Sequence, residues 1–268
     1  MRLPSLTLAA AGVALLAPTT LPAPGIEPLA HGEPVVPGQP LARGGPVTHG
    51  QPLAHGEPAT HGQPVTHRAR NQRHQGEVRA ADLLAKVRDC TAVSRGRYRA
   101  DEGAPATIPV CGTRDAVFWK ADMDIDCDGR PGRLCNRRTD PFFAGTTAYQ
   151  QSDGPQLSAE RLPYVVVPAP SRIWDHRASG VQGGSVVAVL YRDRVRYAVV
   201  GDVGTYDVIG EASYATAKAL GIRPDPHGGG TASGVTYIAF KNSRVTPIGD
   251  RARAAAIGER LARRFARR

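Results

Sequence analysis

Residues 185–213 decide the fold: SVVAVLYRDRVRYAVVGDVGTYDVIGEAS. Two runs rich in β-branched residues, 185–191 and 195–200, are separated by the polar residues 192–194. Such a pair of runs with a short polar connector predicts a β-hairpin. The second run is strongly apolar, so it predicts a buried strand that can hold the residues after it in a fixed position.

Two carboxylates follow this hairpin, and glycines flank both of them. Asp202 ends the second run, and Glu211 precedes a helix that Ser213 is placed to cap and Gly221 is placed to end. Hydrolysis of a glycosidic bond needs one carboxyl group as proton donor and one to activate water. A helix N-terminus favours an ionised Glu211, whereas burial and the charge of Asp202 raise its pKa. The sequence leaves that balance open, and carboxylates near glycines are also common in turns.

The other apolar segments predict a strand-rich domain. Residues 80–88 predict a helix, and residues 164–167 and 235–240 predict strands. Strands outnumber helices and do not alternate with them, which indicates a mixed, β-rich α+β barrel or sandwich with a few helices.

The C-terminus predicts an amphipathic helix. The chain has 34 Lys+Arg against 24 Asp+Glu, a net charge of +10, and residues 251–268 contribute seven arginines. Ile257, Leu261 and Phe265 recur every four residues, and Asp250 is placed to cap the helix. A basic tail can contact nucleic acid or teichoic acid, but a solvated helix face is the simpler interpretation, and no nucleic-acid partner is expected.

Four aspartates alternate with apolar residues in the first half of the chain: Asp122, Asp124, Asp126 and Asp128. In an extended segment they lie on one face, about 6–7 Å apart, with Met123, Ile125 and Cys127 on the other. Three interpretations stay open: an acidic groove for a cationic ligand, a solvated strand face, and a calcium site. The spacing resembles the start of an EF-hand loop, but the twelfth position is Cys135 instead of Glu.

The N-terminal part is expected to be an export signal and a linker. Residues 1–23 have a charged start and an apolar stretch at 3–17, which is typical of a signal peptide with an uncertain cleavage site; an uncleaved anchor is the alternative. Residues 24–75 hold seven His/Gly/Pro hexapeptides with proline at each fourth place, which predicts a disordered spacer. A catalytic domain is expected at 76–268.

Export implies an oxidising compartment, in which an even number of cysteines favours disulfides. Cys127 and Cys135 would close a short loop, and Cys90 and Cys111 would then tie the first helix to the strands. Four cysteines allow three pairings, and the sequence does not choose among them. No G-x-S-x-G motif is present, so serine catalysis is poorly supported.

Three blocks carry a family resemblance: ADMDIDCDG (121–129), AVVGDVGTYDVIGEASYATAKALGI (198–222) and GVTYIAF (234–240). In order and spacing they resemble the chitosanases of glycoside hydrolase family 75, over about residues 85–268. The resemblance implies an inverting hydrolysis with Asp202 as general base and Glu211 as general acid. It also implies a set of substrate-binding residues, namely Asp122, Asp124, Asp126, Asp128 and Tyr237. Thr205-Tyr206 departs from the proline-containing turn expected there, which concerns loop shape only.

The hairpin followed by Asp-x-Gly also looks like the double-psi β-barrels of cell-wall enzymes, so we expect a six-stranded barrel of that type with added helices. The resemblance implies a secreted, extracellular and monomeric endo-chitosanase that acts on chitosan, without cofactor, metal or, after signal removal, membrane attachment. Two alternatives stay open: a non-catalytic carbohydrate- or wall-binding domain, which would bind without cleavage, and a calcium-stabilised structural domain, which a chelator would destabilise.

Overall fold

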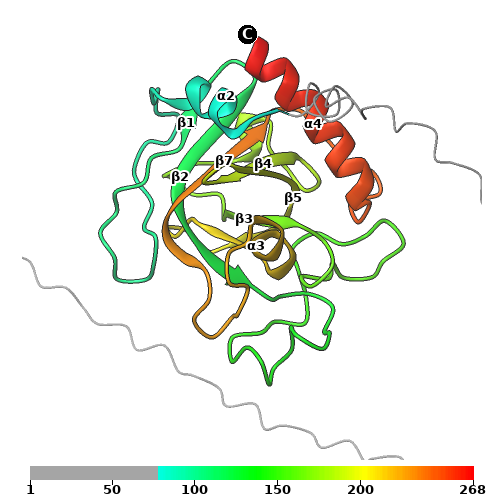
Figure 1. Ribbon diagram of the computed structural model, residues 1–268. Coiled ribbons are helices and arrows are strands. Elements are labelled where there is room, and N and C mark those ends of the chain that lie inside the picture. The colour runs from blue at the N-terminus through cyan, green and yellow to red at the C-terminus, as the bar shows by residue number, and fades with distance from the viewer. Residues whose placement is uncertain (1–77) are drawn as a thin grey trace, which may run out of the picture. The chain divides into compact units, whose positions relative to one another are not determined.

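The computed structural model describes residues 78–268, and within them six strands close a β-barrel (Figure 1). Around the barrel the order is β2 (Ala116–Asp126), β6 (Glu211–Ser213), β3 (Tyr164–Pro168), β5 (Arg194–Gly204), β4 (Val186–Tyr191) and β7 (Thr231–Phe240). β7 pairs with β2 and thereby closes the barrel, and the short β1 (Cys111–Gly112) adds to β2. The predicted six-stranded barrel with added helices is confirmed.

The strand pairing joins segments that are far apart in the sequence. β2 runs parallel to β6, and β3 runs parallel to β5, whereas the other pairings are antiparallel. The predicted hairpin is β4–β5, and its turn is shorter than expected because β5 already begins at Arg194. Arg192 in this turn has a φ of 56°, the left-handed conformation that tight hairpin turns require.

Short helices pack at the ends of the strands. α2 (Ala80–Leu84) continues into η1 (Ala85–Val87), as the sequence predicts, and η2 (Arg177–Ser179) is a single turn. α3 (Tyr214–Leu220) starts directly after β6. The Ser213 hydroxyl accepts a hydrogen bond from the Thr216 N–H, and Gly221 ends the helix at a φ of 74°, so both predicted caps are confirmed.

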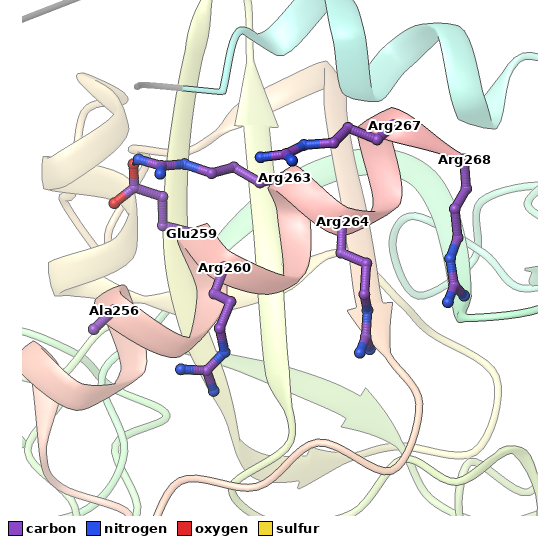
Figure 2. A pocket seen from close by; sticks show the side chains of 7 residues that line it. All are labelled: Ala256, Glu259, Arg260, Arg263, Arg264, Arg267 and Arg268. Atoms are coloured by element: carbon purple, nitrogen blue, oxygen red, sulfur yellow. The ribbon is translucent and has the colours of Figure 1, made fainter. Parts of the chain in front are cut away.

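The C-terminal helix α4 (Arg251–Arg267) is amphipathic as predicted, and Asp250 caps it by accepting from the Arg253 N–H. Its small and aromatic residues face the barrel: Ala254, Gly258, Ala262 and Phe265. Its arginines line an open hollow of about 570 Å³ (Figure 2). Arg260, Arg264 and Arg268 extend to one side, and Arg263 lies on another side, where it pairs with Glu259.

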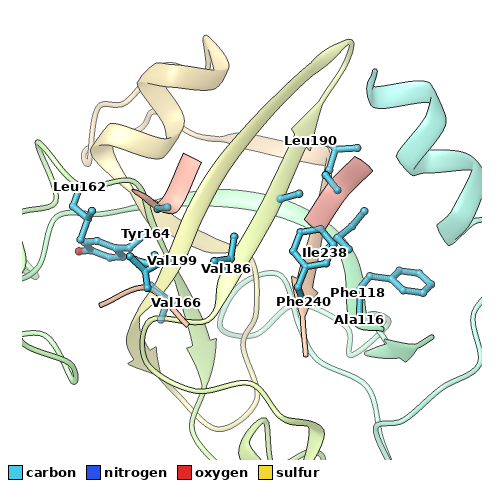
Figure 3. Close-up of a cluster of buried hydrophobic side chains, with 14 of the residues drawn as sticks. Ala116, Phe118, Leu162, Tyr164, Val166, Val186, Leu190, Val199, Ile238 and Phe240 are labelled. Atoms are coloured by element: carbon cyan, nitrogen blue, oxygen red, sulfur yellow. The ribbon is translucent and has the colours of Figure 1, made fainter. Parts of the chain in front are cut away.

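β3, β4 and the central part of β5 are buried on both faces, which explains their continuous apolar sequences. Along β4, Val186, Ala188 and Leu190 belong to one buried cluster, while Val187 and Val189 belong to another. The first cluster also contains Tyr164, Phe118 and Phe240 (Figure 3) and the buried face of α4. The barrel is thus a packed scaffold that can hold side chains at its strand ends in fixed positions.

Two disulfides join Cys90 to Cys111 and Cys127 to Cys135, which selects one of the three pairings that the sequence left open. No helix between residues 78 and 268 is long and apolar enough to cross a membrane. The expected signal and repeat linker lie outside the described residues.

Candidate active site

The two predicted catalytic carboxylates lie in one cleft. Asp202 is near the end of β5 and Glu211 is the first residue of β6, and both line a cleft of about 180 Å³. Asp126 and Asp128, at the end of β2 and just beyond it, line the same cleft. Asp140 is the fifth carboxylate in its lining, and we call this space the acidic cleft.

Glu211 lies where it can keep a proton at neutral pH. Burial, followed by the charges of Asp124, Asp202 and Asp128, raises the pKa of Glu211 to about 7. The sequence left open whether the helix N-terminus lowers the pKa of Glu211 or burial raises it. In the structure, burial has the larger effect. Gly204 leaves the space that the side chain occupies, since a Cβ there would lie 2.8 Å from Glu211 Oε2.

Asp202 is buried, with 7% of its surface exposed, and two backbone groups hold it. Its Oδ1 accepts hydrogen bonds from the N–H groups of Ala148 and Val203, each at 2.7 Å. Burial raises the pKa of Asp202, and these two hydrogen bonds oppose that change by stabilising the ionised form. Both bonds use Oδ1, which leaves Oδ2 for a water molecule.

Asp126 and Asp128 place two further carboxyl groups beside Asp202. One carboxylate oxygen of each of the three residues lies within 4.8 Å of the others. Burial, and then the charge of Asp202, raises the pKa of Asp126 well above its usual range, and burial raises that of Asp128 to about 6. The Tyr164 hydroxyl lies 3.0 Å from Asp126 Oδ1 and from the Asp128 carbonyl, and can donate to either.

The predicted row of four aspartates is divided in the structure. Asp122 and Asp124 lie in a second group with Asp101, from a loop that precedes β1, and their carboxylate oxygens are again within 4.8 Å of one another. Asp122 is only 4% exposed. The EF-hand-like set is thereby split between the two groups, and Cys135, at its twelfth position, is in a disulfide.

Tyr237 lies in the core, not in the acidic cleft. It is fully buried and stacks on Trp119 with ring centroids 5.2 Å apart. Its hydroxyl lies within hydrogen-bond distance of the carbonyls of Asp122 and Gly210, at 2.9 and 3.1 Å. From there it supports the backbone of two acidic segments and does not face the solvent.

Sequence reasoning missed two further residues of the cleft, Asp140 and Phe142. Phe142 is 91% exposed, although it lines the cleft, and the Phe142 N–H donates to Asp140 Oδ1. An aromatic residue in a polar loop gives no periodic signal, so only its exposure in the folded chain singles it out.

Comparison with known proteins agrees with this geometry. Endo-chitosanase C of Aspergillus oryzae is 31% identical over 133 residues, which cover 48% of this chain and 32% of that protein. An endo-chitosanase of Aspergillus oryzae strain ATCC 42149 / RIB 40 is 31% identical over 138 residues, 47% of this chain and 56% of that protein. The chain thus spans about a third to just over half of the length of these curated relatives.

The family model described as "Fungal chitosanase of glycosyl hydrolase group 75" matches residues 123–267, more than half of the chain. The matched residues include Asp202, Glu211 and three of the four alternating aspartates: Asp124, Asp126 and Asp128. The chain therefore belongs to the chitosanase family of glycosyl hydrolase group 75.

Proposed function

We propose that this protein is a secreted endo-chitosanase that hydrolyses the β-1,4 glucosamine linkages of chitosan with inversion at the anomeric carbon. The observation that carries the proposal is the pair in the acidic cleft. Glu211, whose pKa is raised to about 7, is suited to donate a proton, and Asp202, held by two N–H groups, is suited to accept one.

In the proposed reaction, protonated Glu211 gives its proton to the glycosidic oxygen as the bond from that oxygen to C1 breaks. Ionised Asp202 takes a proton from a water molecule, whose oxygen forms the new bond to C1 from the opposite face. Glu211 ends ionised and Asp202 ends protonated, so one proton must return from Asp202 to Glu211 through solvent before the next turnover.

The charge of the cleft supports a cationic substrate. Chitosan is a polymer of glucosamine and carries ammonium groups, which the carboxylates of Asp126 and Asp128 are suited to bind. The net positive charge of the protein repels chitosan, but salt screens this repulsion beyond a distance of about 8–10 Å. The carboxylates close to the substrate therefore decide binding. Phe142 offers an exposed ring on which a sugar can pack.

Asp122 and Asp124 were expected to bind substrate as well, and their group adjoins Glu211 through the pairing of β2 with β6. Tyr237 acts in this proposal as a support beneath the cleft, since its hydroxyl bonds to the backbone of Asp122. Export is supported by the two disulfides and by the apolar N-terminal segment.

The direct test is release of reducing ends from highly deacetylated chitosan by the full chain and by Glu211→Gln and Asp202→Asn. We expect each substitution to lower kcat by about 10² or more, while Glu102→Gln, an exposed glutamate outside the cleft, leaves it unchanged. Proton NMR of the first products then reports the anomer. A folded parent that releases no reducing ends contradicts the proposed function, and an initial product with retained configuration contradicts inversion.

A further inference from the structure

The C-terminal helix α4 carries a charged face that takes no part in the proposed hydrolysis. Residues 251–268 hold seven arginines and a single acidic residue, Glu259. The opposite side of α4 is buried against the barrel, so the arginines project from a surface that the fold holds in place. We call residues 260, 263, 264, 267 and 268, all of them arginine, the arginine face.

Most of this face lacks a counter-ion within the part of the chain that the structure describes. Arg268 Nη1 lies 2.7 Å from both carboxylate oxygens of Asp115, and Arg263 pairs with Glu259. The other three arginines are exposed and have no ion-pair partner among residues 78–268, namely Arg260, Arg264 and Arg267. The sequence alone favours a solvated helix face, but it does not show which of the charges are neutralised.

The arrangement of these arginines is unfavourable for the helix itself. Residues three or four positions apart are neighbours on a helix, and like charges there repel each other. Within the arginine face, two arginine pairs are three positions apart and three pairs are four positions apart. The helix dipole favours cations only in the last turn, which contains Arg264 and Arg267, so it does not explain Arg260 and Arg263. An anionic ligand would offset this repulsion.

The same side chains line the open hollow of about 570 Å³ beside α4 (Figure 2). A concave surface lined by charges of one sign concentrates the electric field and attracts counter-ions. Arg260, Arg264 and Arg268 extend to one side of the helix, and successive members of this row are about 6 Å apart along the helix axis. Such a row suits a ligand whose negative charges repeat along a chain.

The chemistry of arginine favours phosphate as the repeating group, because the planar guanidinium can bind two phosphate oxygens at once. Nucleic acids also offer phosphates, but proteins that bind single strands add aromatic rings on which the bases stack. Among the described residues the exposed aromatic rings are those of Phe142 and Tyr206, and neither belongs to α4. The face is therefore better suited to a phosphate polymer without bases.

We propose that the arginine face of α4 binds an anionic polymer of repeating phosphodiester groups without bases, as in teichoic acids, and holds the protein at surfaces that carry such a polymer. The arginine face and the acidic cleft share no lining residue. The inference therefore goes beyond the proposed function and does not depend on it.

The test compares the loss of three charges on the face with the loss of three charges elsewhere, in the full chain. The α4 variant removes the unpaired arginines of the face: Arg260→Gln, Arg264→Gln and Arg267→Gln. The control variant removes three exposed arginines outside α4 that have no ion-pair partner among residues 78–268: Arg95→Gln, Arg172→Gln and Arg244→Gln.

Titration calorimetry with lipid-free poly(glycerol phosphate) should show binding weaker by about tenfold or more in the α4 variant, whereas the control variant stays close to the parent. The slope of log K against log salt concentration should decrease in magnitude by about 2 in the α4 variant, because three phosphate contacts are lost.

Stability and activity measurements separate this inference from other effects. The α4 variant loses all the repulsive arginine pairs of the face, so its melting temperature should equal or exceed that of the parent, and weaker binding is then not a result of unfolding. Its release of reducing ends from chitosan should match the parent. If the parent is inactive on chitosan, the proposed function fails and the binding comparison still decides this inference.

Three results would overturn the inference. A parent that does not bind poly(glycerol phosphate) has no such surface. Equal weakening in the α4 and control variants would show that the net charge of the protein attracts the polymer. Tighter binding of single-stranded DNA than of poly(glycerol phosphate), lost only in the α4 variant, would assign the face to nucleic acid instead.

Discussion

Asp124 of β2 lies directly opposite Glu211 of β6 in a parallel pair of strands. β6 has only three residues, and each of them pairs with β2. The position of Glu211, the proposed acid, therefore depends on its pairing with β2. The charge of Asp124 is also the largest electrostatic contribution to the raised pKa of Glu211, after burial. The partner strand therefore positions Glu211 and helps to keep it protonated.

Replacing Asp124 should shift the pH dependence of activity. With Glu211 as acid at a pKa of about 7, kcat/KM should fall as the pH rises through that value. Asp124→Asn removes a negative charge that favours the proton on Glu211, so the alkaline limb should move to lower pH. The measurement is kcat/KM against pH on a soluble glucosamine oligomer, with Glu102→Gln as control. An alkaline limb that stays in place or moves upward in Asp124→Asn contradicts this role.

Conformational stability should decrease between about pH 4 and pH 7. Four carboxyl groups have pKa values raised to between about 6 and 7: Asp122, Asp124, Asp128 and Glu211. In this range the folded state binds more protons than the unfolded chain, so the free energy of unfolding falls as the pH rises.

Buried His176, whose pKa is lowered by burial, contributes with the opposite sign, but it is one group against four. Thermal unfolding from pH 4.5 to 7.5 tests the prediction, and Asp124→Asn should make the curve flatter. A melting temperature that increases steadily over this range would speak against it.

Gly204→Ala should impair catalysis more than folding. The new Cβ would lie 2.8 Å from Glu211 Oε2 and 3.1 Å from Val166 Cγ1, so the end of the Glu211 side chain must shift. A displacement of the Glu211 carboxyl group by about 1 Å should lower kcat by about 10². The loss of stability should be small, because the end of the Glu211 side chain is flexible and can move aside. Gly145→Ala is the matched control, because nothing lies within 4 Å of a Cβ there. Equal activity of the two variants would show that Glu211 does not need this space.

Removal of the Cys127–Cys135 disulfide should destabilise the cleft. The two cysteines are eight positions apart in the sequence. For a loop of this length the chain-entropy model predicts about 2–3 kcal/mol of stabilisation. Asp128 follows Cys127, and the Ala144 N–H donates to its Oδ1 at 2.7 Å. A Cys127→Ser/Cys135→Ser double variant should therefore unfold at lower denaturant concentration and bind chitosan less tightly. The same double substitution at Cys90 and Cys111 should lower stability without this loss of binding.

The ends of the helices α3 and α4 could be predicted from the sequence, because capping residues mark them. Ser213, Gly221 and Asp250 form the caps expected of them, because each interaction involves residues only a few positions apart. The β4–β5 hairpin was equally predictable. Asp202 and Glu211 were recognised as a pair because a short glycine-rich segment joins two rigid elements at their ends.

Other features depend on contacts between distant segments. β7 begins at Thr231, four residues earlier than expected, because Thr231 pairs with Met123 of β2 although residues 232–234 are exposed. The sequence does not predict β6, since three residues have no periodicity and only the pairing with β2 and β3 makes them a strand. Asp122 was expected on an open acidic face, but a register shift between Ala121 and Met123 accompanies its burial.

The backbone hydrogen bonds of Arg99 with Asp207 and Ile209, at 2.8 and 3.0 Å, have a consequence for how such an enzyme can diversify. The residues between the proposed base and acid are also the anchor of the loop that carries Asp101. An insertion or deletion in residues 205–209 would thus displace both the segment that joins Asp202 to Glu211 and the loop that follows Arg99. Changes of length in this segment should therefore be inherited together with changes in the loop that it anchors.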